Sequence, residues 1–285
     1  MRWLSSQSTS LACSFHVSRC SNLLFSTGSK YKLGKRPSFV KQRECSAVKI
    51  VSPNTSSSWE AILPRRRTGE KIDVAQNFDF LLVLDFEATC CDDGPILPYQ
   101  EIIEFPVAKL DTSSWTVSSI FHQYVRPTAN PNITSFCTHL TGIVQEMVDS
   151  QQAIDKVLSD FDDWMKKEEL LKSRFAFVTC GDWDLGVMLP AEAGVKNITI
   201  PSYFNSWINV KKSYCEHSGV FAKGLRHLLK AYNLTHSGHI HSGIDDVKTI
   251  CAVTTAIAKE GYVYRINGST VDDTVPKKLF RNVTV

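Results

Sequence analysis

The sequence lacks any run of apolar residues long enough to cross a membrane, although 43% of its 285 residues are hydrophobic. A helix that spans the hydrocarbon core of a bilayer needs about 20 consecutive, mostly apolar residues. We therefore expect no transmembrane helix and no membrane partner. A chain of this length and composition can bury one good hydrophobic core, or one domain with extensions.

The cysteines also lack the spacing of a disulfide or zinc motif. The nine cysteines form no C-x-x-C motif, and their number is odd. Cys90 and Cys91 are adjacent, at the end of an apolar stretch. This spacing indicates neither a disulfide framework nor a zinc site. We expect free thiols in a reducing compartment.

Acidic residues are absent from the first 43 positions, which hold eight Lys or Arg residues. Without those eight, 24 basic and 29 acidic residues remain, so the formal net charge of +3 becomes about −5 from position 44 onward. The globular part is mildly acidic, and the overall charge is no evidence for a surface that binds nucleic acid.

The same N-terminal segment is rich in serine, which, with the absence of acids, is typical of an organellar transit peptide. We predict a transit peptide over residues 1–45 and a linker over 46–75, where periodicity is lacking. Because serine dominates and arginine is sparse near the start, a chloroplast is favoured, with a mitochondrion as the alternative. A basic tail that contacts nucleic acid is the other interpretation of this segment.

Patterns typical of strands and helices fill residues 76–262, which we predict to be the globular domain. Apolar stretches bounded by turn residues predict strands at 78–88, 101–110, 119–127, 175–180 and 203–210. Helical spacing predicts helices over 154–165, from Asp184 onward, and over 222–233 and 243–261. This order predicts an α/β domain with a mixed sheet flanked by helices. Nothing in the tail, 263–285, suggests chemistry.

Acidic residues stand where three apolar elements end or begin. Asp85 and Glu87 close the strand FDFLLVLDFEA, and residues i and i+2 of a strand share a face, so both carboxylates should project together. Asp184 follows another predicted strand and opens a helix. His241 precedes Asp246 by five residues at the start of the last predicted helix.

Each of these patterns is weak when taken alone. A carboxylate-x-carboxylate pair should arise by chance roughly three times in such a chain, an Asp at a helix start is commonly an N-cap, and a single His is more often a surface or capping residue. Together, these side chains can converge at one end of a sheet, where like charges must be neutralised. Oxygen ligands suit Mg²⁺ or Mn²⁺ rather than zinc. Two such ions can clamp a phosphodiester, with a loop His as the general base for water.

The motifs DFEATC, WDLGVML and H-x-x-x-x-D at 241–246 resemble the three motifs of the DEDDh exonucleases, which have an RNase H-like fold. The motifs DFEATC, EIIEFP, QYVRP, FCTHLTGI and CGDWD are similar to the Eri-like subfamily, which includes the 3′ histone mRNA exonuclease. The similarity covers about residues 76–262. It implies a 3′→5′ exoribonuclease that acts on RNA 3′ ends with two Mg²⁺ ions, for which Mn²⁺ can substitute.

The resemblance also implies roles for single residues. The family's metal-binding positions are matched by Asp85, Glu87, Asp184 and Asp246, and its general base by His241. The resemblance places Glu87 and Leu185 close to the terminal nucleotide, and we add Trp183 and His241 as candidate contacts to it.

Neighbouring residues compete for two of these roles. Asp184 is preferred to Asp182 because it keeps the family's aromatic-Asp-hydrophobic order. Asp246 is preferred to Asp245 because five positions separate it from His241, and His239 is out of register with that spacing.

For several other residues two interpretations stay open. Trp183 and Phe136 either stack on a base, a contact worth about 1–3 kcal/mol in proteins that bind single strands, or pack in the core. Thr141 and Gly142 either approach the substrate 3′ end or form a helix-capping turn. The basic residues of the helix before the third motif either hold phosphates or form a solvated face, and we leave them out of the site; they are Lys223, Arg226 and Lys230.

The sequence departs from the family at its N-terminal side. Animal relatives that bind an RNA stem-loop carry a small helical nucleic-acid-binding domain ahead of the nuclease, whereas the first 75 residues here show no helical periodicity. We therefore do not extend the resemblance to histone mRNA, and structured organellar RNA such as ribosomal RNA is the substrate hypothesis. A DNA exonuclease of proofreading or repair type, a catalytically silent RNA-binding scaffold and a small-molecule phosphodiesterase are the alternatives.

Overall fold

The computed structural model describes residues 74–271 of the chain. The predicted transit peptide, and the predicted linker except for residues 74 and 75, lie outside the described residues. Within the described part, no helix combines the length and the apolar character needed to cross a bilayer.

A mixed sheet of seven strands forms the centre of the domain, with neighbours in the order β2-β3-β1-β5-β6-β7 and with β4 paired to β3. Strand β1 pairs antiparallel with β3 and parallel with β5. The strands are β1 (Phe80–Leu84), β2 (Glu87–Ala88), β3 (Ile102–Asp111), β4 (Thr116–Tyr124), β5 (Phe175–Thr179), β6 (Ser206–Asn209) and β7 (Gly268–Ser269).

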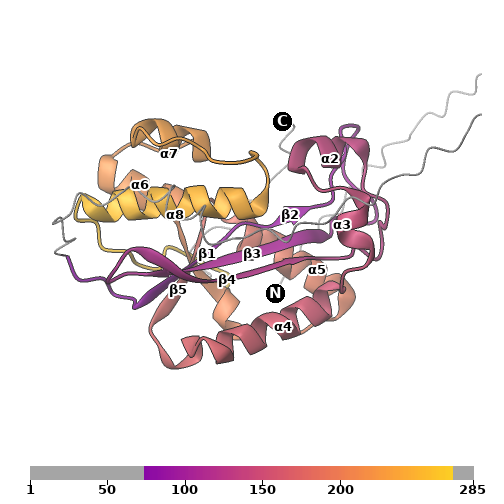
Figure 1. The fold of residues 1–285 in the computed structure, drawn as a ribbon, viewed down its shortest axis with the longest axis horizontal. Helices are drawn as coiled ribbons and strands as arrows, with labels where there is room; N and C mark the ends of the chain where they lie inside the picture. Colours follow the sequence, from indigo (N-terminus) through magenta and orange to yellow (C-terminus); the bar gives the residue numbers. More distant parts are fainter. Residues whose placement is uncertain (1–73, 272–285) are drawn as a thin grey trace, which may run out of the picture. The chain divides into compact units, whose positions relative to one another are not determined.

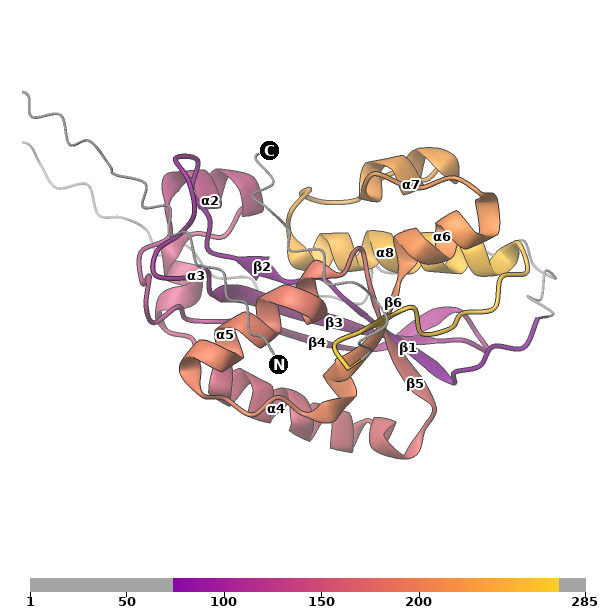
Figure 2. The ribbon, with the colours of Figure 1, turned by 180° about the vertical axis from the view of Figure 1, so that it is seen from behind.

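Helices cover both faces of this sheet, with α4 and α5 on one side and α6, α7 and α8 on the other (Figures 1 and 2). The α-helices are α2 (Ser135–Thr141), α3 (Gln145–Asp149), α4 (Ile154–Lys167), α5 (Leu189–Lys196), α6 (Val210–Ser218), α7 (Leu225–Ala231) and α8 (Gly243–Lys259). Short helical turns are 3₁₀ at η1 (Leu170–Lys172) and η3 (Ser202–Asn205), and π at η2 (Asp184–Met188).

The alternation along β1 explains why two cores form. Leu82 and Leu84 pack on the side that contains Phe161 of α4. Leu81 and Val83 point the other way, into the core that contains Ile250 of α8. Since both faces of the central strands are covered, these strands consist almost entirely of apolar residues.

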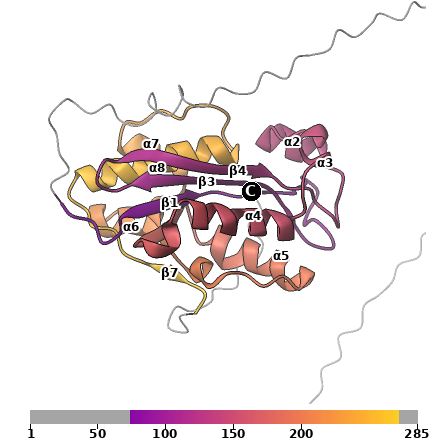
Figure 3. The same cartoon turned by 60° about the horizontal axis from the view of Figure 1, so that its bottom comes forward.

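Helices α2 and α3 lie beside β2, beyond the end of β1 at which the acidic residues are found (Figures 1 and 3). They share a small apolar cluster with Ile103 of β3, to which Cys137, Ile143 and Val148 contribute. The end of the sheet that carries the acidic residues is thereby flanked by two groups of helices.

Most predicted elements are present, with three differences. The first predicted strand is interrupted at Asp85 and Phe86, so β1 and β2 pair in succession with β3. The last predicted strand, 203–210, is shorter, because residues before it form η3 and residues after it form α6. The helices α2, α3 and α6 were not predicted.

The predicted end of the domain at residue 262 is wrong. Tyr264 is completely buried, and its hydroxyl donates a hydrogen bond of 2.8 Å to the carbonyl oxygen of Thr254 in α8. Strand β7 then pairs antiparallel with β6. The domain therefore includes residues of the predicted tail, in which one buried side chain and a two-residue strand are too short to give a periodic pattern.

Candidate active site

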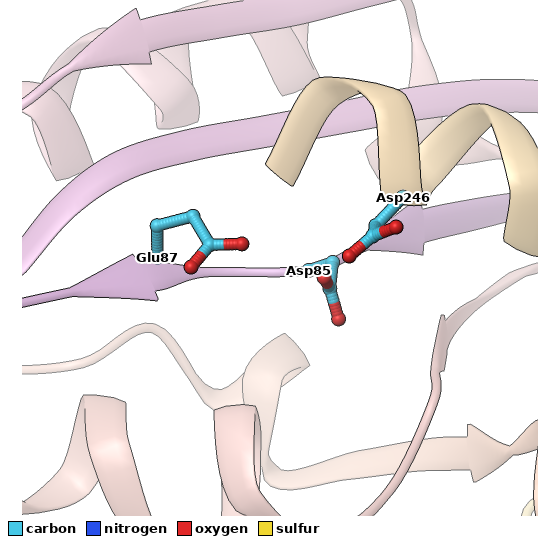
Figure 4. A group of neighbouring side chains, drawn as sticks. All are labelled: Asp85, Glu87 and Asp246. Carbon is cyan, nitrogen blue, oxygen red and sulfur yellow. The ribbon is translucent and has the colours of Figure 1, made fainter. Parts of the chain in front are cut away.

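Three carboxylates converge where β1 ends and α8 begins. Oxygen atoms of Asp85, Glu87 and Asp246 lie within 4.8 Å of one another. Asp85 directly follows β1, Glu87 is the first residue of β2, and Asp246 comes from the first turn of α8 (Figure 4). The sequence prediction that Asp85 and Glu87 project together is confirmed, although the ladder of the sheet breaks between them.

A cavity of about 410 Å³ opens at this cluster. Asp85, Glu87 and Asp184 line it together with His241 and Trp183. The structure thus brings five of the seven predicted site residues into one cavity, and Asp246 adjoins it through the carboxylate cluster.

Asp184 opens the π-helical turn that follows β5, and one of its oxygens accepts a hydrogen bond of 2.9 Å from the backbone N–H of Phe86. This bond connects the second acidic motif to the first. Asp182 lines the same cavity, but its carboxylate pairs with Lys212 at 2.9 Å and accepts a hydrogen bond from the Trp207 indole at 3.0 Å. Because the carboxylate of Asp182 is already engaged by these two partners, the geometry favours Asp184 over Asp182 as an oxygen ligand for a metal ion.

The N-terminus of α8 is held by a residue that sequence reasoning missed. Glu104 of β3 is 1% exposed and accepts hydrogen bonds from the backbone N–H of Gly243 at 2.9 Å and of Ile244 at 3.2 Å. The imidazole of His122 lies 2.8 Å from the same carboxylate. Because the first N–H groups of a helix have no partner within the helix, Glu104 fixes the turn that carries Asp246.

Gly243 is required by close packing at this junction. A Cβ atom at this position would lie 2.8 Å from the backbone oxygen of Asp85 and 3.1 Å from a carboxylate oxygen of Glu104. Only glycine lets α8 begin so close to the end of β1.

Burial opposes the ionisation of this cluster. Burial raises the pKa of Asp85, and the nearby Asp184 raises it further. Burial, followed by the charge of Glu104, raises the pKa of Glu87 to about 10. Burial likewise raises the pKa of Asp184 to about 6 and raises that of Asp246. Carboxylates in such an environment need a cation to remain charged at neutral pH.

The donor set fits divalent metal ions. It consists of carboxylate oxygens, which hard cations such as Mg²⁺ and Mn²⁺ prefer. One oxygen of Asp246 is buried and has no hydrogen bond among the described residues; Nδ1 of His236 lies 3.6 Å from it, beyond hydrogen-bond distance, so the oxygen can still accept an ion. Asp85, Glu87, Asp184 and Asp246 are the residues that would hold such ions.

His241 lies at the edge of the cluster with an exposed side chain. Its backbone has a left-handed conformation, with φ at 66°, and its N–H donates to Asp246 at 3.1 Å. The competing residues lie elsewhere: Asp245 pairs with Lys248 at 2.8 Å, and His239 lines neither of the two cavities found at this end of the sheet.

Two predicted contacts to a nucleotide, Trp183 and Leu185, lie in different environments in the structure. Trp183 lines the cavity with 39% of its surface exposed, so the alternative that it packs in the core is wrong. Leu185 is 1% exposed and lies in the core beside Met188 and Leu189. Its side chain is therefore unavailable to a substrate in this structure, because the turn after Asp184 directs it inward.

The helix-capping interpretation holds for the segment FCTHLTGI. Gly142 ends α2 in a left-handed conformation, and its N–H donates to the carbonyl oxygen of Thr138. The hydroxyl of Thr141 is buried and donates to Cys137 at 2.8 Å. Leu140 of this helix lines the cavity, whereas Phe136 does not.

Lys211 is a second residue that sequence reasoning missed. It lies in the first turn of α6 and lines the cavity, where its positive charge acts to lower the pKa of Asp184. Its amino group has no hydrogen bond or ion pair to another residue within 74–271. The only signal in the sequence is a pair of lysines after the strand SWIN, which also suits a solvated helix face.

Comparison with known proteins agrees with this geometry. A model of the exonuclease family RNase_T matches residues 82–254. ERI1 exoribonuclease 3 of Homo sapiens is 46% identical over 193 residues, which cover 67% of this chain and 57% of the relative. The 3'-5' exoribonuclease 1 of Homo sapiens is 36% identical over 197 residues, covering 67% of this chain and 55% of the relative.

The chain belongs to the Eri-like group of the DEDDh exonucleases. It spans a little over half the length of these two curated relatives. The predicted subfamily is thereby confirmed.

Solved structures confirm the fold expected of a DEDDh exonuclease. The nuclease domain of 3'hExo, a DEDDh family member bound to rAMP, superimposes with a TM-score of 0.66 at 35% identity and covers 68% of this chain and 100% of that chain. A structure of 3'-end specific recognition of histone mRNA stem-loop by 3'-exonuclease has a TM-score of 0.67 at 32% identity and covers 73% and 75%. The predicted RNase H-like mixed sheet flanked by helices is correct.

Proposed function

We propose that this protein is a metal-dependent 3′→5′ exoribonuclease that trims RNA 3′ ends by hydrolysis of the terminal phosphodiester. The observation that carries the proposal is the convergence of Asp85, Glu87 and Asp246 within 4.8 Å, in a chain of a family whose relatives are named exoribonucleases. Buried carboxylates without a permanent counter-charge are costly to a fold, and metal-assisted hydrolysis gives them a use.

In this proposal four carboxylates would hold two Mg²⁺ ions, for which Mn²⁺ could substitute: Asp85, Glu87, Asp184 and Asp246. Bound ions of this kind activate a water molecule and stabilise the leaving oxygen. Glu104 and Gly243 keep the Asp246 turn close to β1, so that the ligands from different elements are held at a short separation before substrate arrives.

His241 accepts the proton of the attacking water. Its exposed imidazole lies at the edge of the carboxylate cluster and can pass this proton on to solvent. The Trp183 indole stacks on the terminal base, and Glu87 contacts the same nucleotide. Lys211, whose amine is unpaired among the described residues, lines the same cavity and supplies positive charge for the phosphate.

The substrate class follows from the relatives rather than from one residue. One similar structure shows a 3′-exonuclease that recognises a histone mRNA stem-loop at its 3′ end. We propose RNA 3′ ends, single-stranded or next to a stem-loop, as the substrate of this chain. With the transit peptide predicted over residues 1–45, structured RNA of the chloroplast, such as ribosomal RNA, is the substrate we infer, and RNA of the mitochondrion is the alternative.

Degradation of labelled nucleic acid tests the activity. The full chain is incubated with Mg²⁺ and with 5′-labelled RNA or DNA of one sequence, with and without a 3′ hairpin. We expect a ladder that shortens from the 3′ end of RNA and is absent with EDTA. A preference for DNA would identify a DNA exonuclease, and binding of RNA without cleavage would identify an RNA-binding scaffold.

Import of a fluorescent fusion tests the location. Residues 1–45 joined to a fluorescent protein should accumulate in chloroplasts of a plant cell. Accumulation in mitochondria would select the alternative organelle, and a diffuse signal would overturn the targeting prediction.

A further inference from the structure

A second cavity, of about 340 Å³, adjoins the carboxylate cluster on the side of α7. It lies between α7 and the segment that leads into α8, and these two elements lie side by side in both ribbon views (Figures 1 and 2). His241 lines both cavities, and Asp246 of the metal cluster lines the second one. A ligand that occupies the first cavity can therefore continue past His241 into the second.

The charge of this second cavity is opposite to that of the first. Lys223 and Arg226 line it, and both side chains are exposed. Neither has a hydrogen bond or ion pair from its side chain to another residue in the described part of the chain. Asp246, at the shared wall, is the only carboxylate that lines the cavity. Two unpaired cations beside an acidic metal site form a local basic surface on a domain whose overall charge is acidic.

A buried imidazole at the same cavity, that of His236, has a hydrogen-bond partner at only one of its two ring nitrogens among the described residues. Nδ1 of His236 lies 2.9 Å from the hydroxyl of Thr249, whereas its Nε2 is buried and has no hydrogen-bond partner among the described residues. The side chain is about nine-tenths buried, with 10% exposed. A buried polar atom of this kind is normally satisfied by a ligand or by water. Apolar side chains of Leu225, Leu229 and Ile240 complete the wall.

We propose that this second cavity binds the ribose-phosphate backbone of the RNA strand upstream of the scissile bond. Lys223 and Arg226 pair with phosphate oxygens, Nε2 of His236 forms a hydrogen bond with the ribose-phosphate backbone, and the apolar wall contacts the sugar or base. The inference rests on the proposed exonuclease function, because the shared His241 wall places the cavity next to the terminal phosphodiester. Under this proposal Lys223 and Arg226 contact phosphates. Lys230 does not line the cavity, so we keep it as part of a solvated face.

A comparison of a long and a minimal substrate tests this inference. The variant is Lys223→Gln with Arg226→Gln, and the matched control is Lys230→Gln, an exposed residue of α7, the helix that also contains Arg226. The long substrate is an RNA of about eight nucleotides, a length typical of a single-strand binding site. The minimal substrate is the 4-nitrophenyl ester of uridine 5′-monophosphate, which has no upstream nucleotide.

We expect the double variant to raise KM for the RNA roughly tenfold, with little change in kcat, and to leave hydrolysis of the ester unchanged. The slope of log KM against log salt should fall by about one for each lost side chain. The control should keep the wild-type KM. A loss no larger than that of the control, or an equal loss on the ester, would overturn the inference.

Failure of the proposed function is separable from failure of this inference. If the wild-type protein cleaves neither substrate, the exonuclease proposal fails. Fluorescence anisotropy of the labelled RNA with Ca²⁺ in place of Mg²⁺ then compares the same variants. Weaker binding by the double variant than by the control supports the basic cavity, and equal binding overturns it.

Discussion

Glu104 of β3 accepts a hydrogen bond of 2.9 Å from the backbone N–H of Gly243, the first residue of α8. The two residues are 139 positions apart in sequence. This bond attaches the helix that carries Asp246 to the strand that pairs with the Glu87 segment. The carboxylate cluster is therefore assembled by a contact whose members are not proposed to touch substrate.

Glu104→Gln should lower kcat about tenfold, since loss of a residue that supports metal ligands typically costs 10- to 100-fold in activity or metal affinity. The glutamine keeps the shape of the side chain but weakens the acceptor for Gly243 and Ile244. Steady-state kinetics over a range of Mg²⁺ concentrations measures the effect, and we expect the Mg²⁺ requirement to rise. Glu146→Gln, at an exposed position, is the control. Unchanged kinetics would show that α8 is fixed without Glu104.

Asp184→Asn and Asp182→Asn form a matched pair in one cavity. The asparagine of the first variant would retain an oxygen acceptor for the Phe86 N–H, so the fold should persist while turnover falls by at least about a hundredfold. Asp182→Asn should keep most of the activity, because the wild-type carboxylate is engaged by Lys212 and Trp207. Cleavage of labelled RNA and circular dichroism measure both. The reverse order of activities would assign the metal to Asp182.

The metal-free protein should lose stability as the pH rises. Asp184 has a pKa of about 6 in the fold, raised by burial above its ordinary value of 3.8. A raised pKa means that the folded state binds the proton more tightly than the unfolded state does. Protonated Asp184 therefore contributes fully to the free energy of unfolding below pH 3.8, and this contribution is lost as the pH rises through 6. Thermal melts in EDTA should therefore show a falling Tm across this window, and Mg²⁺ should reverse the fall.

The Asp184→Asn protein provides the control for these melts. Its Tm in EDTA should depend less on pH between about 4 and 7, because a group that titrates in this window has been removed. Equal slopes for the two proteins would show that Asp184 is not the titrating group.

Glu101 should protect the fold against acid. Burial opposes its charge, but Lys196 at 2.8 Å and the N–H groups of Thr128, Ala129 and Asn130 outweigh burial and lower its pKa to about 2. A lowered pKa contributes stability above the ordinary value of 4.5, and this is lost as the pH falls through 2. Glu101→Gln should cost about 3 kcal/mol at pH 7.

Urea unfolding at a series of pH values measures this effect. The difference between Glu101→Gln and the wild type should shrink as the pH is lowered from about 5 toward 2, whereas exposed Glu146→Gln should have no effect at any pH. A difference that is independent of pH would assign the loss to packing rather than to charge.

The sequence predicted the acidic centre well because its signal is local. The spacing of Asp85 and Glu87 follows the period of a strand, and Asp246 stands in the first turn of a long helix. The partners from distant elements were missed. Glu104 occurs within a strand as an isolated polar residue, and its role depends on α8, which is distant in sequence. Lys211 and His236 likewise become informative only when a cavity places them next to the acids.

The use of local sequence periodicity also explains which of the predictions were wrong. Leu185 follows a metal-binding position in sequence, but the π-helical turn directs its side chain into the core. Helix α6 begins immediately after β6, because Asn209 is both the last residue of the strand and the N-cap of the helix, so the predicted strand extends into the helix. Tyr264 belongs to no periodic pattern, and its hydrogen bonds join it to Thr254 of α8 and to Gln76 and Asn77, which are distant in sequence.

The short strand β7 determines how the sheet ends. It covers one side of β6 with two residues, which is too short an edge to pair readily with another molecule. A protein shortened at residue 262 would present the hydrogen-bonding groups of β6 and the partly apolar chain SWIN to its neighbours. We therefore expect the last described residues to shield this edge of the sheet from other molecules, independently of any part they have in catalysis.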